Sequence, residues 1–164
     1  HGKEDTLITI QIDFQLAERF GMTYVDAEGQ TKYPYVIHRT SIGCYERTLA
    51  LLLEKYAGAL PTWLMPEQVR VLPISDRLID DAKKVEEQLS RAGIRVSCDT
   101  RSEKVGYKIR EAQLEKIPYM LVIGDKEVEE GTVSVRSRKE GDLGSMPVES
   151  FLSKILQEIA TKAK

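Results

Sequence analysis

The sequence predicts an α/β protein in two parts, an α+β part over residues 1–66 and an α/β domain over residues 67–164. Three observations support this division. A strictly alternating strand lies near the start, prolines and a glycine interrupt regular structure between 58 and 66, and strands alternate with helices afterwards. Because strand–helix–strand units join parallel strands, we expect the second part to have a mixed, largely parallel sheet flanked by helices.

The composition is that of a globular protein with no overall attraction to nucleic acid. The 164 residues are 41% hydrophobic and 30% charged, which is enough apolar material for a core. The net charge is −2, so any contact with phosphate must come from a local basic face. No apolar run approaches the roughly 18–20 residues that span a membrane, and no signal-peptide pattern is present. Cys44 and Cys98 form no CxxC pair, so we expect a cytoplasmic protein without a membrane partner.

Residues 7–14 are expected to form a strand with one apolar and one polar face. Such a strand suits an antiparallel sheet whose polar face lines a cleft. Residues 23–25, a turn at 26–29 and residues 33–39 predict a hairpin after it. The apolar face of the first strand consists of Ile8, Ile10, Ile12 and Phe14, and the polar face of Thr9, Gln11 and Asp13.

A helix is expected next, capped by Thr40 or Ser41 and running to about Tyr56. Gly58 ends this helix, and the linker Leu60–Pro66 places the domain boundary at residue 66. The apolar stripe of the helix consists of Leu49, Leu52, Leu53 and Tyr56.

The second part is predicted to alternate between strands and helices up to a strongly amphipathic final helix. Gly93 closes its first helix, and a second helix is expected over 103–116. Strands are expected at 69–74, 94–98, 119–123 and 132–138, with a turn between 124 and 131. The apolar face of the final helix consists of Val148, Phe151, Leu152, Ile155, Leu156 and Ile159.

No standard catalytic signature occurs in the sequence, which contains no Walker loop, GxGxxG or GxSxG motif. The two histidines and two cysteines are scattered, so neighbouring residues alone cannot assemble a metal site. Spacing and composition therefore predict only an α/β protein with a partial β domain.

Several ordered blocks carry a more specific resemblance, and together they extend over essentially the whole chain. One group resembles the end of the catalytic domain of threonyl-tRNA synthetases, which are class II synthetases, and the other resembles their anticodon-binding domain. The resemblance implies a partial antiparallel catalytic sheet with the third signature motif and its helix, followed by a complete anticodon-binding domain. The first group is Thr9–Phe14, Ala17–Phe20, Val36–Arg39, Gly43–Arg47 and Pro61–Leu64, and the second is Arg101–Arg110, Pro118–Glu127, Val133–Arg136 and Asp142–Gly144.

Within the first group, Gly43-x-x-Glu-Arg47 is similar to the third signature motif. The resemblance implies that Arg47 is catalytic and contacts ATP, because a planar guanidinium suits an adenine face and glycine lets a ligand approach the backbone. It also implies that Thr9 and Gln11 contact the adenylate. The alternative for Arg47 is an exposed helical arginine beside Glu46.

His38 matches the third zinc ligand of the family. The resemblance implies zinc as a cofactor, with two further ligands expected upstream of His1, and magnesium bound with ATP. Such a metal would hold the threonine hydroxyl and so reject valine. The alternative is a strand histidine with a single hydrogen bond. Cys44 stands where many relatives have a small hydroxyl residue, and we expect it to be a packing residue.

In the second group, the resemblance implies that Ser102, Glu127 and Arg136 contact anticodon bases. Candidates for phosphate contacts are Lys108, Arg110 and Lys116. The alternative is that this basic surface is only a solvated face. The further basic residues of the region are Arg101, Lys104, Arg138 and Lys139.

The resemblance implies a homodimeric threonine–tRNA ligase that uses threonine, ATP and threonine tRNA, with no DNA partner. This chain alone is expected to be inactive, because the first two signature motifs do not occur in it. Two alternatives remain. The first is a non-catalytic tRNA-binding or regulatory homologue, and the second is an α/β interaction module that does not discriminate between tRNAs.

Overall fold

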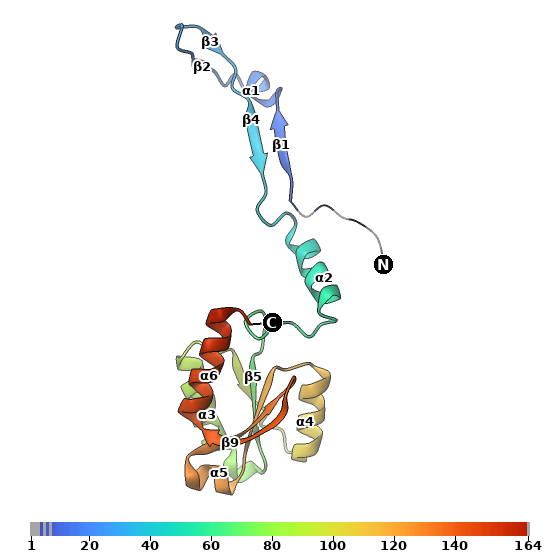
Figure 1. Ribbon diagram of the computed structural model, residues 1–164, viewed down its shortest axis with the longest axis vertical. Coiled ribbons are helices and arrows are strands. Elements are labelled where there is room, and N and C mark those ends of the chain that lie inside the picture. Colours follow the sequence, from blue (N-terminus) through green and yellow to red (C-terminus); the bar gives the residue numbers. More distant parts are fainter. Residues whose placement is uncertain (1–3, 5, 7, 164) are drawn as a thin grey trace. The chain divides into compact units, whose positions relative to one another are not determined.

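The computed structural model describes residues 4, 6 and 8–163, and the chain divides into two compact units, 1–55 and 56–164 (Figure 1). None of the helices in the described ranges is both long enough and apolar enough to cross a bilayer.

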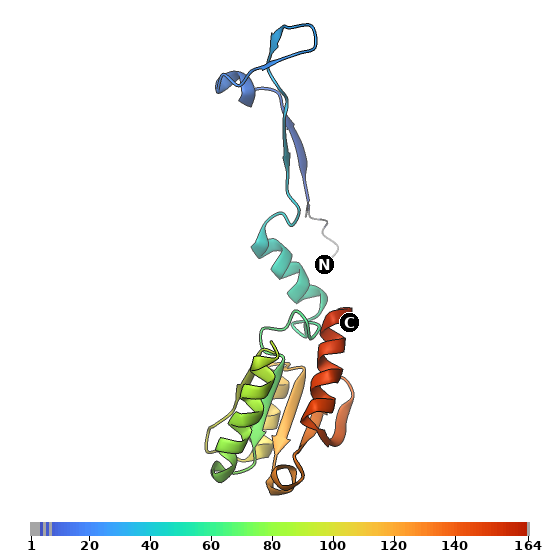
Figure 2. The same cartoon turned by 90° about the vertical axis from the view of Figure 1, so that its left-hand side faces the viewer.

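The first unit consists of two short antiparallel ladders and two helices. Strand β1 pairs with β4, and β2 pairs with β3 in a hairpin. Figure 2 shows the β1–β4 ladder edge-on, and among the described residues no helix lies along either of its faces. The elements are β1 Ile10–Asp13, α1 Leu16–Arg19, β2 Tyr24–Val25, β3 Thr31–Lys32, β4 Val36–Arg39 and α2 Tyr45–Lys55.

Two expectations for the first unit are wrong in detail. The strand at the end of 33–39 pairs with β1 and not with 23–25, because the hairpin turn is closed by β3. Neither Thr40 nor Ser41 caps α2. The backbone N–H of Thr40 donates to the carbonyl of Thr9 at 3.2 Å, which extends the β1–β4 ladder, and Gly43 turns the chain with a φ of +77° before the helix begins. Leu7, at the start of the predicted strand, lies outside the described residues.

The second unit contains a mixed sheet flanked by helices, as predicted, and this sheet has five strands. The order is β6-β5-β7-β8-β9, in which β5 pairs in parallel with β6 and β7, while β8 pairs antiparallel with β7 and β9. The strands are β5 Val69–Pro73, β6 Val96–Cys98, β7 Tyr119–Ile123, β8 Thr132–Ser137 and β9 Gly141–Pro147.

Helices cover the sheet of the second unit on both faces (Figure 1). Helices α3 and α6 pack on one face through Leu89 and Phe151, against Leu121 and Val133 of the strands. Helix α4 packs on the other face, against β5 and β7, through Ala112. The helical segments are η1 Asp76–Leu78, α3 Ile79–Arg91, α4 Val105–Leu114, α5 Asp125–Glu130 and α6 Val148–Thr161.

Two elements of the second unit were not predicted. The expected turn between 124 and 131 contains the short helix α5, and residues 141–147 form the strand β9. Helix α5 contains one apolar residue, Val128, so it has no periodicity to detect. In β9, Gly141 and Gly144 have left-handed φ angles and a bulge shifts the register, so its alternation is interrupted.

The predicted linker packs inside the second unit. It has no helix or strand over 60–66, as expected, but Leu60, Thr62 and Met65 are buried. The segment therefore belongs to the folded body of the second unit.

Candidate nucleic-acid interface and catalytic fragment

The β1–β4 ladder brings three predicted site residues of the first unit onto one face. Residues directly opposite each other in an antiparallel pair share a face, and Gln11 lies opposite His38. Thr9 and Asp13 are two residues to either side of Gln11 and project in the same direction. A shallow hollow at this place is lined by Gln11, Asp13, Gln15 and His38, among others. The expectation that the polar face lines a cleft fits this geometry.

His38 has one acidic neighbour, and the two do not make a complete zinc site. Its Nε2 lies 3.8 Å from the Asp13 carboxylate. One oxygen of Asp13 accepts hydrogen bonds from the backbone N–H groups of Gln15 and Leu16, both at 2.8 Å, and these bonds lower the pKa of the carboxyl. Within the described residues no three His, Cys, Asp or Glu side chains gather closely enough to hold a metal. A zinc site here therefore requires ligands beyond these residues.

Arg47 lies in the first turn of α2, just after the turn at Gly43. Its Nη1 donates to the backbone carbonyl of Thr6 at 2.9 Å. The nearby Cys44 is exposed and donates its S–H to Glu46 at 2.8 Å, so the expectation that Cys44 is a packing residue is wrong in this structure. The physical reason is that Cys44 precedes a helix in which no described side chain is buried.

In the second unit, Ser102 and Glu127 lie near the carboxyl ends of the parallel strands, the edge where α/β sheets commonly bind ligands. Ser102 donates its hydroxyl to Asp76, which follows β5, at 2.9 Å. Glu127 lies in α5, which directly follows β7. Because β5 and β7 are neighbours in parallel, both loops emerge at the same edge of the sheet. A further ion pair between Arg77 and Asp125, at 2.5 Å, links the two loops.

The carboxylate of Glu127 is held in a defined orientation. One oxygen accepts a hydrogen bond from the backbone N–H of Gly124 at 3.0 Å, and the other lies 3.4 Å from the hydroxyl of Ser145 on β9. Gly124 makes this possible, because a Cβ at that position would lie 2.8 Å from the Glu127 oxygen and 2.9 Å from Ile74. A carboxylate in this position is an acceptor for the N–H edge of a base.

Arg136 lies on the sheet face opposite α3 and α6. Val133 and Val135 point into the core that those helices cover, so alternation directs Ser134 and Arg136 to the other face. Ser134 pairs with Ser145, the neighbour of Glu127, and Arg136 follows two residues, roughly 7 Å, further along β8. The guanidinium of Arg136 is partly exposed and contacts Asp142 at 3.0 Å. Arg136 thus lies on an exposed strip of β8 and β9, and Glu127 of α5 borders this strip at Ser145.

The three phosphate candidates occupy different environments. Lys108 is 2% exposed, and its ammonium donates to the carbonyls of Asp99 at 3.0 Å and Pro73 at 3.4 Å. It therefore lies inside the domain, where no phosphate reaches it, and this placement corrects its assignment as a phosphate contact. The ammonium of Lys116 donates to the carbonyl of Ala57. Arg110 is exposed on α4.

Two other basic residues are also engaged within the domain. Arg101 pairs with the buried Asp99 at 2.6 Å and with Glu111 at 2.5 Å, and its hydrogen bonds hold the pKa of Asp99 below the ordinary value. Arg138 donates only to backbone carbonyls among its described partners. Much of the basic pattern in the sequence therefore stabilises the fold, and Lys104 joins Arg110 as an exposed cation beside α4.

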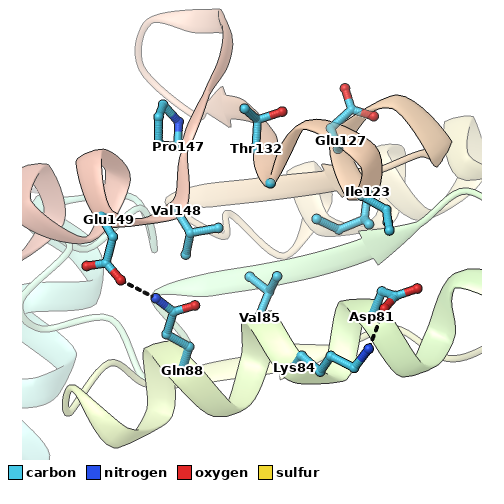
Figure 3. Close-up of a pocket in the computed structure, with 12 residues that line it drawn as sticks. Asp81, Lys84, Val85, Gln88, Ile123, Glu127, Thr132, Pro147, Val148 and Glu149 are labelled. Carbon is cyan, nitrogen blue, oxygen red and sulfur yellow. Dashed lines mark hydrogen bonds and ion pairs between the residues drawn. The ribbon is translucent and has the colours of Figure 1, made fainter.

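A cavity of about 340 Å³ lies on the α3 side of the sheet, between α3, α5 and the start of α6. Its rim carries two internal pairs, Lys84 with Asp81 at 2.7 Å and Gln88 with Glu149 at 2.6 Å (Figure 3). Figure 3 shows the Glu127 carboxylate directed away from the α3 side chains. Glu127 borders this cavity as well as the strip, whereas Arg136 is not among the residues that line the cavity.

Ser145 and Asp142 are parts of this strip that were not predicted from the sequence. Both lie on β9, whose alternation is broken by two glycines, so no strand was expected there. The signal that was available is the pattern Gly141-Asp142-x-Gly144, in which an aspartate between glycines accepts from the backbone two residues on, here the N–H of Gly144 at 2.9 Å.

Family models match both units of the chain. Residues 68–158 match the family described as "Anticodon binding domain", which is more than half of the chain. Residues 1–56 match the family described as "tRNA synthetase class II core domain (G, H, P, S and T)".

Individual relatives agree with both models. The chain is 64% identical over 162 residues to a threonine–tRNA ligase of Clostridium perfringens (strain SM101 / Type A), which covers 99% of this chain and 25% of that protein. It is 60% identical over 164 residues to that of Clostridium botulinum (strain Eklund 17B / Type B), covering 100% of this chain and 26% of that protein. The chain thus spans about a quarter of the length of these curated relatives.

A solved structure shares the fold. The crystal structure of the RNA binding domain of threonyl-tRNA synthetase from Cryptosporidium parvum Iowa II matches with a TM-score of 0.79 and 39% sequence identity. The match covers 92% of this chain and 38% of that one. The resemblance stated from the sequence and the predicted fold class are both confirmed.

Proposed function

This chain belongs to the anticodon binding domain family through residues 68–158 and is a relative of threonine–tRNA ligases, and from that premise we propose that it is the tRNA-reading part of such a ligase. A ligase containing it would activate threonine with ATP and transfer it to threonine tRNA. The observation that carries the proposal is the exposed strip of β8 and β9, which carries Arg136 and is bordered by Glu127 of α5, in the unit that matches the anticodon model.

The strip offers complementary hydrogen-bonding groups for unstacked bases. Arg136 presents a planar, partly exposed guanidinium, which donates to base acceptors, while Glu127 accepts from base N–H groups. Without tRNA, the Arg136 side chain donates to Asp142, and a bound base would compete with Asp142 for the guanidinium. Ser102, hydrogen-bonded to Asp76 at the carboxyl edge, adds a hydroxyl that can donate or accept. Arg110 and Lys116 are the remaining phosphate candidates.

The first unit supplies part of the catalytic site in this proposal. Thr9 and Gln11 would contact the adenylate from the polar face of the β1–β4 ladder, and Arg47, after the turn at Gly43, would contact ATP with its magnesium. His38 would be one zinc ligand, with the others contributed by a part of the ligase outside the described residues. The first two signature motifs do not occur here, so we propose that this chain by itself forms no adenylate.

We further propose that the complete ligase is cytoplasmic and homodimeric, with threonine tRNA as its nucleic-acid partner. A non-catalytic tRNA-binding homologue shares the same interface. It would bind threonine tRNA without activating threonine even when joined to the rest of a catalytic domain. An interaction module unrelated to tRNA would show no preference among transcripts.

The experiment that tests the proposal compares two arginine variants of the chain for binding to a threonine tRNA transcript at one fixed salt concentration. Arg136→Ala is expected to weaken binding by about 1–3 kcal/mol, because a base contact is lost. The matched control is Arg91→Ala, which also removes one positive charge, but from the far side of the sheet, on α3. Its binding should change little.

Circular dichroism of both variants verifies that the fold is retained. Equal loss of binding in the two variants would show that only total charge matters, and would contradict base reading at Arg136.

A further inference from the structure

We propose that Arg138 is a positioning residue that ties the segment 57–65, which leads from the catalytic fragment, to the anticodon-reading strand β8. This inference rests on the proposed function and assigns a role to a residue outside the base-reading strip. Its consequence is that a displacement of β8 on base binding would be transmitted to the connecting segment, residues 57–65, through the hydrogen bonds of Arg138.

Arg138 gathers three backbone carbonyls from two distant parts of the chain. Its Nη1 donates to the carbonyl of Lys116 at 2.5 Å, and its Nη2 donates to the carbonyls of Leu60 at 2.7 Å and Ala59 at 3.3 Å. Its own backbone N–H donates to the carbonyl of Pro118 at 2.8 Å. One side chain thus joins the connecting segment, the end of α4 and the end of β8.

Among the residues that the structure describes, no carboxylate forms an ion pair with the guanidinium of Arg138. Burial lowers the pKa of Arg138, and Glu158 counteracts this only from a distance. A partly buried guanidinium is stabilised by the carbonyls it bonds, and losing the side chain would remove these donors from three partly buried carbonyls. A surface salt bridge would not require such an arrangement.

A second cation binds the same segment, at backbone positions of unusual conformation. Lys116 donates its ammonium to the carbonyl of Ala57. Both residues have left-handed φ angles, +61° for Lys116 and +48° for Ala57, which non-glycine residues adopt at a cost of about 1–3 kcal/mol. Such conformations persist where surrounding contacts enforce them, and here each residue belongs to the contact that holds the other.

The far end of the segment is fixed independently. Thr62 donates its hydroxyl to one oxygen of Glu158 at 2.6 Å, and Tyr119 donates to the other oxygen at 2.6 Å. Arg95 donates to the carbonyls of Trp63 and Met65, at 2.9 and 2.8 Å. The segment is therefore attached at both ends, and Arg138 is the attachment that directly follows the base-reading strand β8.

Arg138 follows Arg136 by two residues on the same side of the chain, and β8 is paired on both sides, with β7 and β9. A base that draws Arg136 away from Asp142 acts on this strand close to its end at Ser137. Because Arg138 bonds the carbonyls of Ala59 and Leu60 directly, a displacement at the end of β8 would also displace those carbonyls of the connecting segment. Misplacement of a substrate by about 1 Å is enough to cost up to 100-fold in rate.

The test uses the complete ligase carrying Arg138→Ala and compares steady-state aminoacylation with the wild type. We expect kcat to fall about tenfold while KM for tRNA stays nearly unchanged, because the base-reading strip is intact. The matched control is Lys139→Ala, which removes the exposed cation next in sequence and should leave both constants unchanged. Arg138→Lys should recover part of kcat, since an ammonium can bond one or two of the carbonyls.

A second readout and a second variant separate positioning from misfolding. Hydrogen exchange of amides 57–65 in the 164-residue chain should accelerate in Arg138→Ala, while amides of β5 and β7 keep their protection. Thr62→Val removes the hydrogen bond from the segment to Glu158 and should also lower kcat, with KM for tRNA unchanged. Unchanged kcat in both Arg138→Ala and Thr62→Val would overturn the inference. A wild-type ligase that neither binds nor charges threonine tRNA would instead overturn the proposed function itself.

Discussion

The two units use the same building pattern, an alternating strand with a polar and an apolar face, with opposite results. In the second unit the apolar side chains of β5, β7 and β8 are buried under α3 and α6. In the first unit Ile10 and Ile12 on β1 and Ile37 on β4 remain 67%, 55% and 66% exposed. Among its described residues only Ala17 is buried. An alternating pattern therefore specifies a strand, but a core requires a second layer to cover it.

The same contrast applies to the candidate sites. Glu127 and Arg136 are held by residues of their own domain, namely Gly124, Ser145 and Asp142. Among the described residues, His38 has one acidic neighbour, Asp13, and no further residue that could complete a metal site. The reading site of the second unit is thus formed within this chain, whereas the residues of the first unit form a fragment of a larger site.

The largest expected effect comes from removing an apolar side chain of the second unit, compared with the same kind of change in the first unit. Phe151→Ala should lower the free energy of unfolding of the second unit by about 3–5 kcal/mol, because a fully buried ring is removed. Ile12→Ala should change the free energy of unfolding measured in the same way by less than about 0.5 kcal/mol, since this side chain is already exposed to water. Guanidinium titration followed by the fluorescence of Trp63, the one tryptophan, reports on the second unit.

Similar losses of unfolding free energy in the two variants would mean that the units share a core, and would contradict the contrast between a covered and an uncovered strand.

A smaller effect is expected from acid. Asp99 has its pKa lowered mainly by hydrogen bonds from Arg101, so its carboxylate stabilises the fold above its ordinary pKa of about 3.9. This contribution is lost as the pH falls further, through the lowered pKa of the folded state. Asp99→Asn should cost about 1–2 kcal/mol at neutral pH and should flatten the loss of stability below pH of about 4. Urea titrations between neutral and acidic pH measure both quantities.

Parallel acid profiles for Asp99→Asn and the wild type would show that other carboxylates control the acid sensitivity of the domain.

The predictability of the fold divides along the same line. Where one residue type dominates a face, as in β7 or α6, the pattern in the sequence predicted the element. Where backbone turns and pairing with distant strands set the bounds of an element, the pattern in the sequence did not predict those bounds. Helix α2 begins at Tyr45 because the chain first continues the ladder at Thr40 and then turns at Gly43. The pairing of Thr40 with Thr9 is long-range, so the local propensity of the sequence does not reveal it.

Lys108 shows the same limit at the level of the site. A lysine beside other basic residues suggested a phosphate contact, yet it is enclosed between the ends of β5 and β6. Its spacing of four residues from Ala112 places both on the buried face of α4, so helical periodicity contained the relevant signal. The role of Arg138 had no such signal, because its partners are carbonyls of segments distant in sequence.

The smallest expected effect concerns metal. Because His38 lacks sufficient neighbouring ligands among the described residues, chelation of zinc should leave the thermal unfolding of the 164-residue chain and its binding to tRNA unchanged. Calorimetry with and without a chelator measures the first quantity. A clear destabilisation on chelation would show that the chain binds metal by itself, and that the first unit contains a complete metal site.

The most direct test of the central claim, that the second unit reads an anticodon, is the binding of this chain to three threonine tRNA transcripts at one salt concentration. One transcript is native, and the other two carry replacements of the middle G or the third U of the anticodon. We predict that each replacement weakens binding by about 1–3 kcal/mol, because the groups on the β8–β9 strip lose their partners. Equal, salt-sensitive binding of all three transcripts would contradict the claim and leave only an unspecific basic surface.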